Sequence, residues 1–157
     1  MNEKELTYLR HCMDFVTESN KIEGIYGCSN AQVSEFMRFM ALPKVSITEL
    51  KKFVKVYQPD AQLRNKVGLN VRVGNYYPPL GGPHIRVGLE ALLEEANNTA
   101  SPREAAFKIH LEYETLHPFT DGNGRSGRML WAWMYRDLSL GFLHRFYYQS
   151  LEYSRHV

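Results

Sequence analysis

Apolar positions recur at helical spacing over most of the chain. Within residues 2–18 the apolar side chains fall three or four positions apart, with charged residues between them. They are Leu6, Leu9, Met13 and Val16. The same periodicity predicts helices over residues 30–40, 47–57, 85–95, 101–116, 125–138 and 142–155. The pattern therefore predicts an all-α fold, a helical bundle.

Two capping-box patterns mark where helices should begin. Ser46 is followed three residues later by Glu49, directly before an apolar run. Ser101 is followed by Glu104 at the same interval, with Pro102 at the first helical position. We expect both serines to cap the helices that follow them.

One segment departs from helical periodicity. Residues 67–77 read VGLNVRVGNYY, in which Val71 and Val73 alternate around Arg72. Prolines and glycines follow this segment at once, up to Pro83. Alternation ended by such residues predicts a short strand or β-hairpin.

Length and charge limit the classes of protein to consider. The chain has 157 residues without repeats or linker-like stretches, so we expect one domain over residues 1–157. Nineteen Lys and Arg residues oppose 17 Asp and Glu residues, a net charge of +2. This charge is too small for a broad basic face, which argues against nucleic acid as a partner.

The N-terminus and the cysteines bear on the compartment. Cys12 and Cys28 are too few for a disulfide framework or a four-thiolate metal site. The N-terminus is polar and lacks the apolar core of a signal peptide, and no apolar run reaches membrane-spanning length. We therefore expect a cytoplasmic protein without a membrane partner.

Residues 117–128, HPFTDGNGRSGR, lie between two predicted helices and carry candidate chemistry. Pro118 disfavours helical geometry at His117, so the preceding helix should end there with its imidazole at the tip. Such a histidine can accept a proton near neutral pH. His110, seven residues earlier, has no ligand pattern to complete a zinc site, and we expect it to pack in the core.

The second half of this segment suggests an anion site. Residues 122–124 read GNG and precede a predicted helix, so their N–H groups and the helix dipole should attract an anion. Arg125 and Arg128 can reach one side of the first helical turn. Asp121 is a suitable oxygen ligand for Mg²⁺ carried by phosphates. A base, an anion cradle, a metal ligand and two arginines predict phosphate chemistry.

Residues 117–128 resemble, without departure, the HPFx(D/E)GNGRxxR motif of the Fic (filamentation induced by cAMP) family. The lead-in AFKIHLEYETLHPF is similar to the helix before that motif, and LNVRVGNYYPPLGGPHI is similar to the target-docking flap. The resemblance covers roughly residues 67–136 and extends more weakly to both ends. It implies the Fic fold, a helical bundle with a small β-hairpin flap.

The resemblance also implies an activity, which is protein adenylylation (AMPylation). AMP passes from ATP, with Mg²⁺ as cofactor, to a Ser, Thr or Tyr hydroxyl of a target protein, and pyrophosphate is released. The related Doc-type kinases replace the GNGR part of the motif and transfer the γ-phosphate. Because this chain keeps GNGR, nucleotidyl transfer is the better prediction.

The family's functional residues map onto positions in this chain. The resemblance implies that His117 is the general base, that Asp121 binds Mg²⁺ and that Phe119 anchors the loop. It implies that the phosphates of ATP are held by Gly122, Asn123, Gly124, Arg125 and Arg128, with Asn123 and Arg125 also catalytic. The target would dock on the flap, residues 67–79, where Val73, Gly74, Asn75 and Tyr76 would contact target and nucleotide.

A second motif lies near the N-terminus. Residues 17–26, TESNKIEGIY, resemble the family's inhibitory motif (S/T)xxxE(G/N), matched by Ser19, Glu23 and Gly24. The resemblance implies a salt bridge between Glu23 and Arg128 that competes with the γ-phosphate. The expected organisation is an inhibitory segment over residues 1–27 and a catalytic core over residues 67–155.

Other functions remain open from the sequence. In relatives the same glutamate also supports removal of AMP, so Glu23 could position water in a de-AMPylase. Transfer of another nucleotide and a non-catalytic nucleotide-sensing module are further alternatives. Related domains continue past the position of Arg155 with a helix that closes the adenine pocket. We therefore expect a minimal pocket, a loosely held base, or a pocket completed by a partner chain, such as a second copy in a homo-oligomer.

Overall fold

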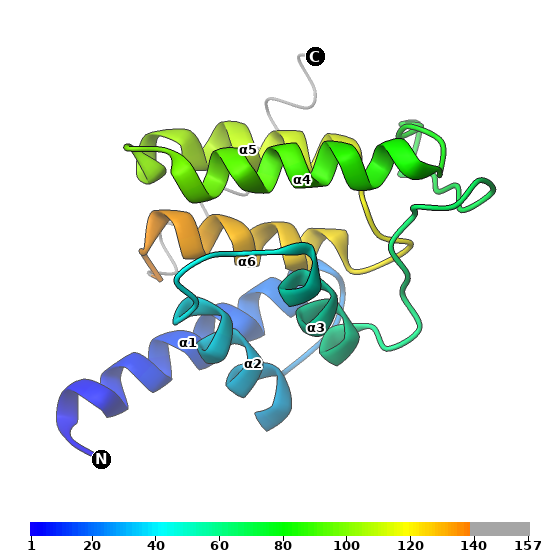
Figure 1. The fold of residues 1–157 in the computed structure, drawn as a ribbon. Coiled ribbons are helices and arrows are strands. Elements are labelled where there is room, and N and C mark those ends of the chain that lie inside the picture. The colour runs from blue at the N-terminus through cyan, green and yellow to red at the C-terminus, as the bar shows by residue number, and fades with distance from the viewer. Residues whose placement is uncertain (139–157) are drawn as a thin grey trace.

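The computed structural model describes residues 1–138, and the helix predicted over residues 142–155 lies outside them. Six α-helices account for the secondary structure of this range (Figure 1). They are α1 (Glu3–Ile22), α2 (Asn30–Met40), α3 (Ile47–Tyr57), α4 (Pro83–Asn98), α5 (Pro102–Leu116) and α6 (Asn123–Tyr135). The predicted all-α class is confirmed.

Helix α6 forms the centre of the bundle. Figure 1 shows α4 and α5 side by side above α6, with α1, α2 and α3 below it. Nearly every residue of α6 from Asn123 to Met134 is buried, because helices cover it on both sides. Trp131 stacks on Phe15 of α1, whose ring in turn contacts Phe36 of α2. The core thus joins the N-terminal helix to α6, which begins within the HPFTDGNGRSGR segment.

Several helix ends differ from the sequence-based boundaries. The first helix continues to Ile22, four residues beyond the predicted end, and Glu23 is its C-cap. Gly24 then turns the chain with a left-handed φ of 77°. The last described helix begins at Asn123, two residues earlier than predicted. These two shifts put Ser19 inside α1 and the GNG sequence at the start of α6.

The two predicted capping boxes have different outcomes. Ser46 Oγ accepts the Glu49 N–H at 3.2 Å and caps α3 as expected. The prediction for Ser101 is wrong, because its side chain makes no cap hydrogen bond. Pro102 already fills the first helical position of α5, where it removes one N–H that would otherwise need a partner.

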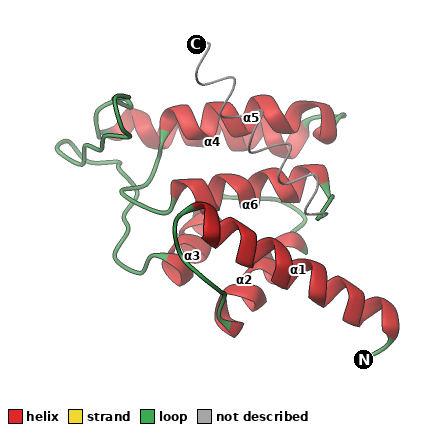
Figure 2. Cartoon of the chain, turned by 180° about the vertical axis from the view of Figure 1, so that it is seen from behind, coloured by secondary structure: helices red, strands yellow, loops and turns green. Residues whose placement is uncertain are grey.

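The segment between α3 and α4 contains no strand, and Figure 2 shows it as a loop. We call residues 65–82 the 65–82 loop. Of the predicted hairpin only one antiparallel bridge is present, Val73 with Tyr76, closed by reciprocal backbone hydrogen bonds of 2.9 and 2.8 Å. Gly74 supplies the φ of 58° that this two-residue turn needs. The hairpin prediction therefore holds for a single residue pair.

The base of the 65–82 loop is closed more tightly than its tip. Asn70 Oδ1 accepts the Gly81 N–H at 2.8 Å, and a Cβ on Gly81 would lie only 2.5 Å from the Leu69 carbonyl oxygen. In contrast, Val73 and Tyr76 at the tip are 44% and 42% exposed. None of the helices within residues 1–138 has the length and apolar character needed to span a bilayer.

Candidate active site

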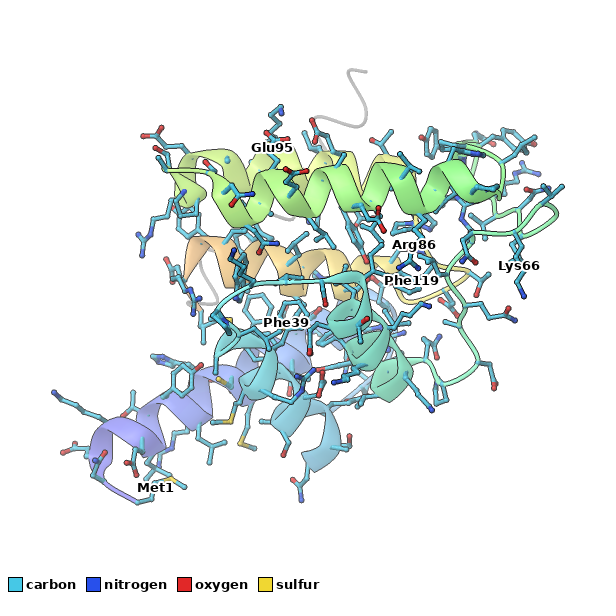
Figure 3. All side chains as sticks on the ribbon, viewed as in Figure 1. Met1, Phe39, Lys66, Arg86, Glu95 and Phe119 are labelled. Carbon is cyan, nitrogen blue, oxygen red and sulfur yellow. The ribbon has the colours of Figure 1, made fainter. Side chains whose placement is uncertain are left out.

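Residues 117–128 comprise the α5–α6 connection and the first residues of α6; their interior is buried, and we call this segment the 117–128 turn. His117 ends α5 in the left-handed conformation, with φ 50° and ψ 63°, as the following proline favours a non-helical backbone. Phe119 is 1% exposed and points into the bundle (Figure 3). The turn is therefore anchored from inside while His117 lies at its start.

The Asn123 side chain closes this turn. Its Oδ1 accepts the Phe119 N–H at 2.9 Å and its Nδ2 donates to the Phe119 carbonyl at 2.8 Å. Gly122, with φ 78°, forms the N-cap of α6. With the amide of Asn123 engaged, the groups left to meet an anion are the N–H groups at the start of α6, which have no helical partners.

The His117 ring is half-buried and hydrogen-bonded to its own helix. Its Nδ1 lies 3.3 Å from the Glu114 carbonyl oxygen, and an Nδ1 that donates there leaves Nε2 as proton acceptor. Burial lowers the pKa of His117, Arg64 acts in the same direction, and the Glu114 carbonyl opposes both. The lowered pKa of His117 favours the neutral ring, whose Nε2 can accept a proton.

Arg128 Nε and Nη2 are engaged by the C-terminal end of α1. Its Nη2 lies 2.7 Å from Glu23 Oε1 and donates to the Ser19 carbonyl at 3.0 Å. Its Nε donates to Ser19 Oγ at 2.8 Å. The contact that the inhibitory motif predicts between Glu23 and Arg128 is therefore present, and Ser19 contributes two further bonds. Gly24 makes no close packing contact at its Cα and serves the turn after α1.

Gly124 provides the space in which the Glu23 carboxylate lies. A Cβ on Gly124 would overlap Glu23 Oε1 and would come within 3.2 Å of Glu23 Cδ. The carboxylate therefore sits directly against the first turn of α6. An anion already occupies the place where the helix N-terminus is expected to hold one.

Arg125 is also buried but is less well partnered. Its guanidinium lies 5.8 Å from the centre of the Tyr57 ring, and its Nε has no hydrogen-bond partner within the described chain. Arg125 and Asn20 line a cavity of about 10 Å³, large enough for one water. Burial lowers the pKa of Arg125, and the charges of Glu23 and Asp121 oppose this shift. An unpaired buried donor fits the predicted anion.

Asp121 lies exposed on the outer side of the 117–128 turn. Its Oδ2 accepts from Gln58 Nε2 at 2.6 Å, and its Oδ1 accepts the Gly122 N–H at 2.8 Å. Within residues 1–138 no three metal-ligating side chains converge. A lone exposed carboxylate fits a Mg²⁺ ion whose other ligands come with phosphates and water.

The four predicted flap residues lie together at the tip of the 65–82 loop. Val73 and Tyr76 are 44% and 42% exposed, and Gly74 and Asn75 form the turn between them. Tyr76 Oη donates to the Thr115 carbonyl at 2.8 Å, which fixes the tip to the last turn of α5. The tip is therefore held near His117.

Sequence reasoning missed a layer of titratable side chains behind the turn, in which His110 is buried and the Glu114 side chain is 31% exposed. Burial raises the pKa of Glu114 to about 7, an effect that Arg128 opposes and Glu23 reinforces. Its Oε1 lies 3.7 Å from His110 Nε2. His110 Nδ1 lies 3.0 Å from the Gly127 carbonyl, and burial lowers the pKa of His110 to about 4. His110 thus packs in the core, as expected, and the spacing of residues 110, 114 and 117 is the signal that could have revealed this layer.

The second missed feature is Arg64, which is completely buried. Its side chain donates to backbone carbonyl oxygens of both the 65–82 loop and the end of α5. No sequence pattern marks such an arginine, because its acceptors are main-chain atoms that any residue carries.

The comparison with protein families agrees with the motif. The model of the Fic/DOC family matches residues 44–135, more than half of the chain. The match includes the 117–128 turn and the 65–82 loop and leaves Ser19 and Glu23 outside it. No curated protein matches the chain.

Proposed function

The chain belongs to the Fic/DOC family, and on that premise we propose that it is a protein adenylyltransferase held inactive by Glu23. Nucleotidyl transfer or a related activity follows from the family, and AMP transfer from ATP is our more specific proposal. The observation that carries it is the 117–128 turn, which places His117 at the end of α5 and leads directly into a helix N-terminus with two buried arginines.

In the proposed reaction His117 Nε2 takes the proton of a target Ser, Thr or Tyr hydroxyl. The hydroxyl oxygen forms a bond to the α-phosphorus of ATP, and the bond from that phosphorus to the bridging oxygen breaks. Pyrophosphate leaves with the electron pair, and the proton stays on His117. A positioned general base contributes about 10²- to 10⁴-fold to such a step.

The other motif residues hold the substrate in this proposal. The N–H groups of Asn123 and Gly124 and the side chain of Arg125 would bind phosphate oxygens, and Asp121 would bind Mg²⁺. The Gly122 N–H would join them once Asp121 Oδ1, which now accepts it, turns to the metal. Bound Mg²⁺ would neutralise phosphate charge. Phosphoryl-type transfer depends mainly on positioning and charge stabilisation, which these groups supply.

Target binding is assigned to the exposed tip of the 65–82 loop. The exposed Val73–Tyr76 bridge is a place where a target segment could add as a further strand, with little sequence preference. A second copy of the chain is a further candidate partner. Both cysteines are free, which suits the reducing cytoplasm in which we place the reaction.

Autoinhibition follows from the state of Arg128 in this proposal. The γ-phosphate needs the same guanidinium edge that Glu23 occupies at 2.7 Å. A carboxylate and a phosphate compete for that edge, and like charges exclude each other. ATP would bind weakly, or with its α-phosphate misplaced, until Glu23 leaves.

The same carboxylate favours a second candidate function, de-AMPylation. Glu23 lies against the first turn of α6, where an AMP phosphate would be held. There it could take a proton from water while the water oxygen attacks the phosphorus of a target–AMP bond. The bond from that phosphorus to the target oxygen would break, the proton taken from water would pass to the target oxygen, and the products would be AMP and the restored target hydroxyl.

The test is intact-mass spectrometry of the protein and of a lysate after incubation with Mg²⁺ and ATP. Four proteins are compared: wild type, Glu23→Gly, Glu23→Gln and Glu23→Gly with His117→Ala. We expect an AMP-sized gain that is weak in wild type, strong in both Glu23 variants and absent without His117. His84→Ala, at an exposed histidine of α4, is the control for histidine loss.

Two results would redirect the proposal. A phosphate-sized gain would indicate kinase-like chemistry in place of nucleotidyl transfer. No gain with any nucleotide, although nucleotide binds, would favour de-AMPylation or a sensing module.

A further inference from the structure

Arg64 is an unusual arginine, because its side chain is 0% exposed and it has no carboxylate partner within residues 1–138. A buried charge without compensation is costly, so its surroundings must satisfy it with hydrogen bonds. The role of this buried arginine should therefore be sought in the segments that its hydrogen bonds join.

The guanidinium bonds join two segments that are far apart in sequence. Nε donates to the His117 carbonyl at 2.6 Å and Nη2 to the Leu116 carbonyl at 2.9 Å. Nη1 donates to the carbonyls of Leu69 and Pro79 at 3.1 and 2.8 Å. One planar group therefore fastens the end of α5 to both ends of the exposed part of the 65–82 loop.

The backbone around Arg64 reinforces the same connection. Its N–H donates to the Pro118 carbonyl at 2.8 Å, and its carbonyl accepts the Gly82 N–H at 2.9 Å. Leu63 forms an isolated bridge with Phe119. The segment that carries Arg64 thus runs alongside the start of the 117–128 turn.

These bonds act on the backbone of His117, which sets the direction in which its imidazole points. His117 has a left-handed backbone, which costs a non-glycine residue conformational energy and needs support from its surroundings. The carbonyls of Leu116 and His117 lie at the end of α5 and have no helical donor. Arg64 supplies that donor, and its positive charge suits a helix C-terminus.

We propose that Arg64 is a positioning residue that fixes the backbone of His117 and couples it to the base of the target-docking loop. Arg64 is buried, so it acts through His117 and the loop without touching substrate. This inference rests on the proposed transfer reaction. Beyond that reaction, the inference is that the orientation of the His117 imidazole and the attachment of the 65–82 loop both depend on the Arg64 guanidinium.

The test uses the full chain with Glu23→Gly, so that the inhibitory contact does not mask the effect. Arg64→Met and Arg64→Lys are compared with the parent, and Arg86→Met, at an exposed arginine of α4, is the matched control. Initial rates of AMP transfer are measured well below the melting temperature of each variant. NMR of the His117 ring protons gives a readout without activity.

Misplacement of a reacting group costs on the order of 10²-fold, so we expect Arg64→Met to lower kcat about 10- to 100-fold. The KM for ATP should stay within about twofold, because the phosphate-binding groups are untouched. Arg64→Lys should lose less, since a lysine keeps the charge and some of the donors. The His117 ring resonance should shift in Arg64→Met and not in Arg86→Met.

An unchanged kcat in folded Arg64→Met would overturn the inference, whatever the loss of stability. If Arg64→Met does not fold, Arg64→Lys decides, and a kcat equal to that of the parent would overturn it. If the Glu23→Gly parent transfers nothing, the proposed function fails. The His117 resonance then decides the positioning role alone, and an unshifted signal in the folded Arg64 variant rejects it.

Discussion

The 117–128 turn and the 65–82 loop are neighbours built in opposite ways. The turn buries Phe119 and engages both polar atoms of the Asn123 amide. The loop exposes its tip and holds one bridge, between Val73 and Tyr76. A site that must orient a catalytic base needs a buried and hydrogen-bonded segment such as the turn. A surface that binds varied partners is served by an exposed segment such as the loop.

The largest expected difference between the two regions is in the response to loss of an aromatic ring. Phe119→Ala should lower the free energy of unfolding by about 3–5 kcal/mol, because it leaves a cavity in the core. Tyr77→Ala, on the exposed loop, should change it by less than about 0.5 kcal/mol. Urea denaturation of both variants measures this. Equal losses would show that the loop is as much part of the core as the turn.

A second contrast uses two asparagines. Asn123→Ala removes two buried hydrogen bonds and leaves the Phe119 amide unsatisfied, so we expect a loss of about 2–3 kcal/mol. Asn75→Ala at the tip of the loop should be nearly neutral. Hydrogen exchange at the Phe119 amide reports the opening of the turn directly. A protected amide in Asn123→Ala would contradict the closing role of that side chain.

The layer of titratable side chains behind the turn should give it a pH dependence that the loop lacks. The pKa of His110 is lowered to about 4, so its contribution to stability is present above pH 6.5 and is lost as pH falls toward 4. The pKa of Glu114 is raised to about 7, so its contribution is present below pH 4.5 and is lost as pH rises through 7. The two effects oppose each other between these limits.

Replacing His110 should reveal the pH dependence of stability that Glu114 contributes by itself. In His110→Gln the stability should rise as pH falls from 7 to 4.5, by about 1–2 kcal/mol relative to wild type. Urea denaturation at several pH values measures this difference, with His84→Gln as the exposed control. Parallel pH curves for His110→Gln and wild type would mean that His110 is not held neutral.

The smallest expected effect concerns the tether of the loop tip. Tyr76→Phe removes the bond from Tyr76 Oη to the Thr115 carbonyl, which is exposed, and should cost less than about 1 kcal/mol. The change should instead appear as faster proteolysis within the 65–82 loop. Unaltered proteolysis would show that Tyr76 does not hold the tip.

The sequence could predict what depends on local pattern. Helical periodicity gave the all-α class, and Pro118 indicated where α5 ends. The Glu23–Arg128 contact came from the family resemblance, since no local rule joins residues 105 positions apart. The roles of the site residues stay predictions.

The misses have physical causes as well. Valines alternating around Arg72 predicted a strand, but a strand needs a partner, and the described chain pairs only Val73 with Tyr76. Ser101 precedes α5 with ψ 68°, outside the extended backbone that Ser46 adopts as a cap with ψ 168°, and its side chain makes no cap hydrogen bond. Arg64 was missed because its acceptors are main-chain carbonyls, which are set by the fold.

Glu23 sits at the very end of α1, and this placement determines how quickly a blocked site could respond. Ser19 and Asn20 are buried, whereas the Glu23 side chain is 37% exposed, so breaking the Glu23–Arg128 contact needs a rotation of one side chain and no unfolding of the helix, while the two bonds from Arg128 to Ser19 stay in place. Rotamer changes of exposed groups take picoseconds to nanoseconds. Glu23 and ATP would therefore compete for Arg128 in rapid equilibrium. The apparent affinity for ATP would be lowered in proportion to the fraction of molecules in which Glu23 has left Arg128. On the proposed function, the chain would respond to ATP concentration in a graded manner.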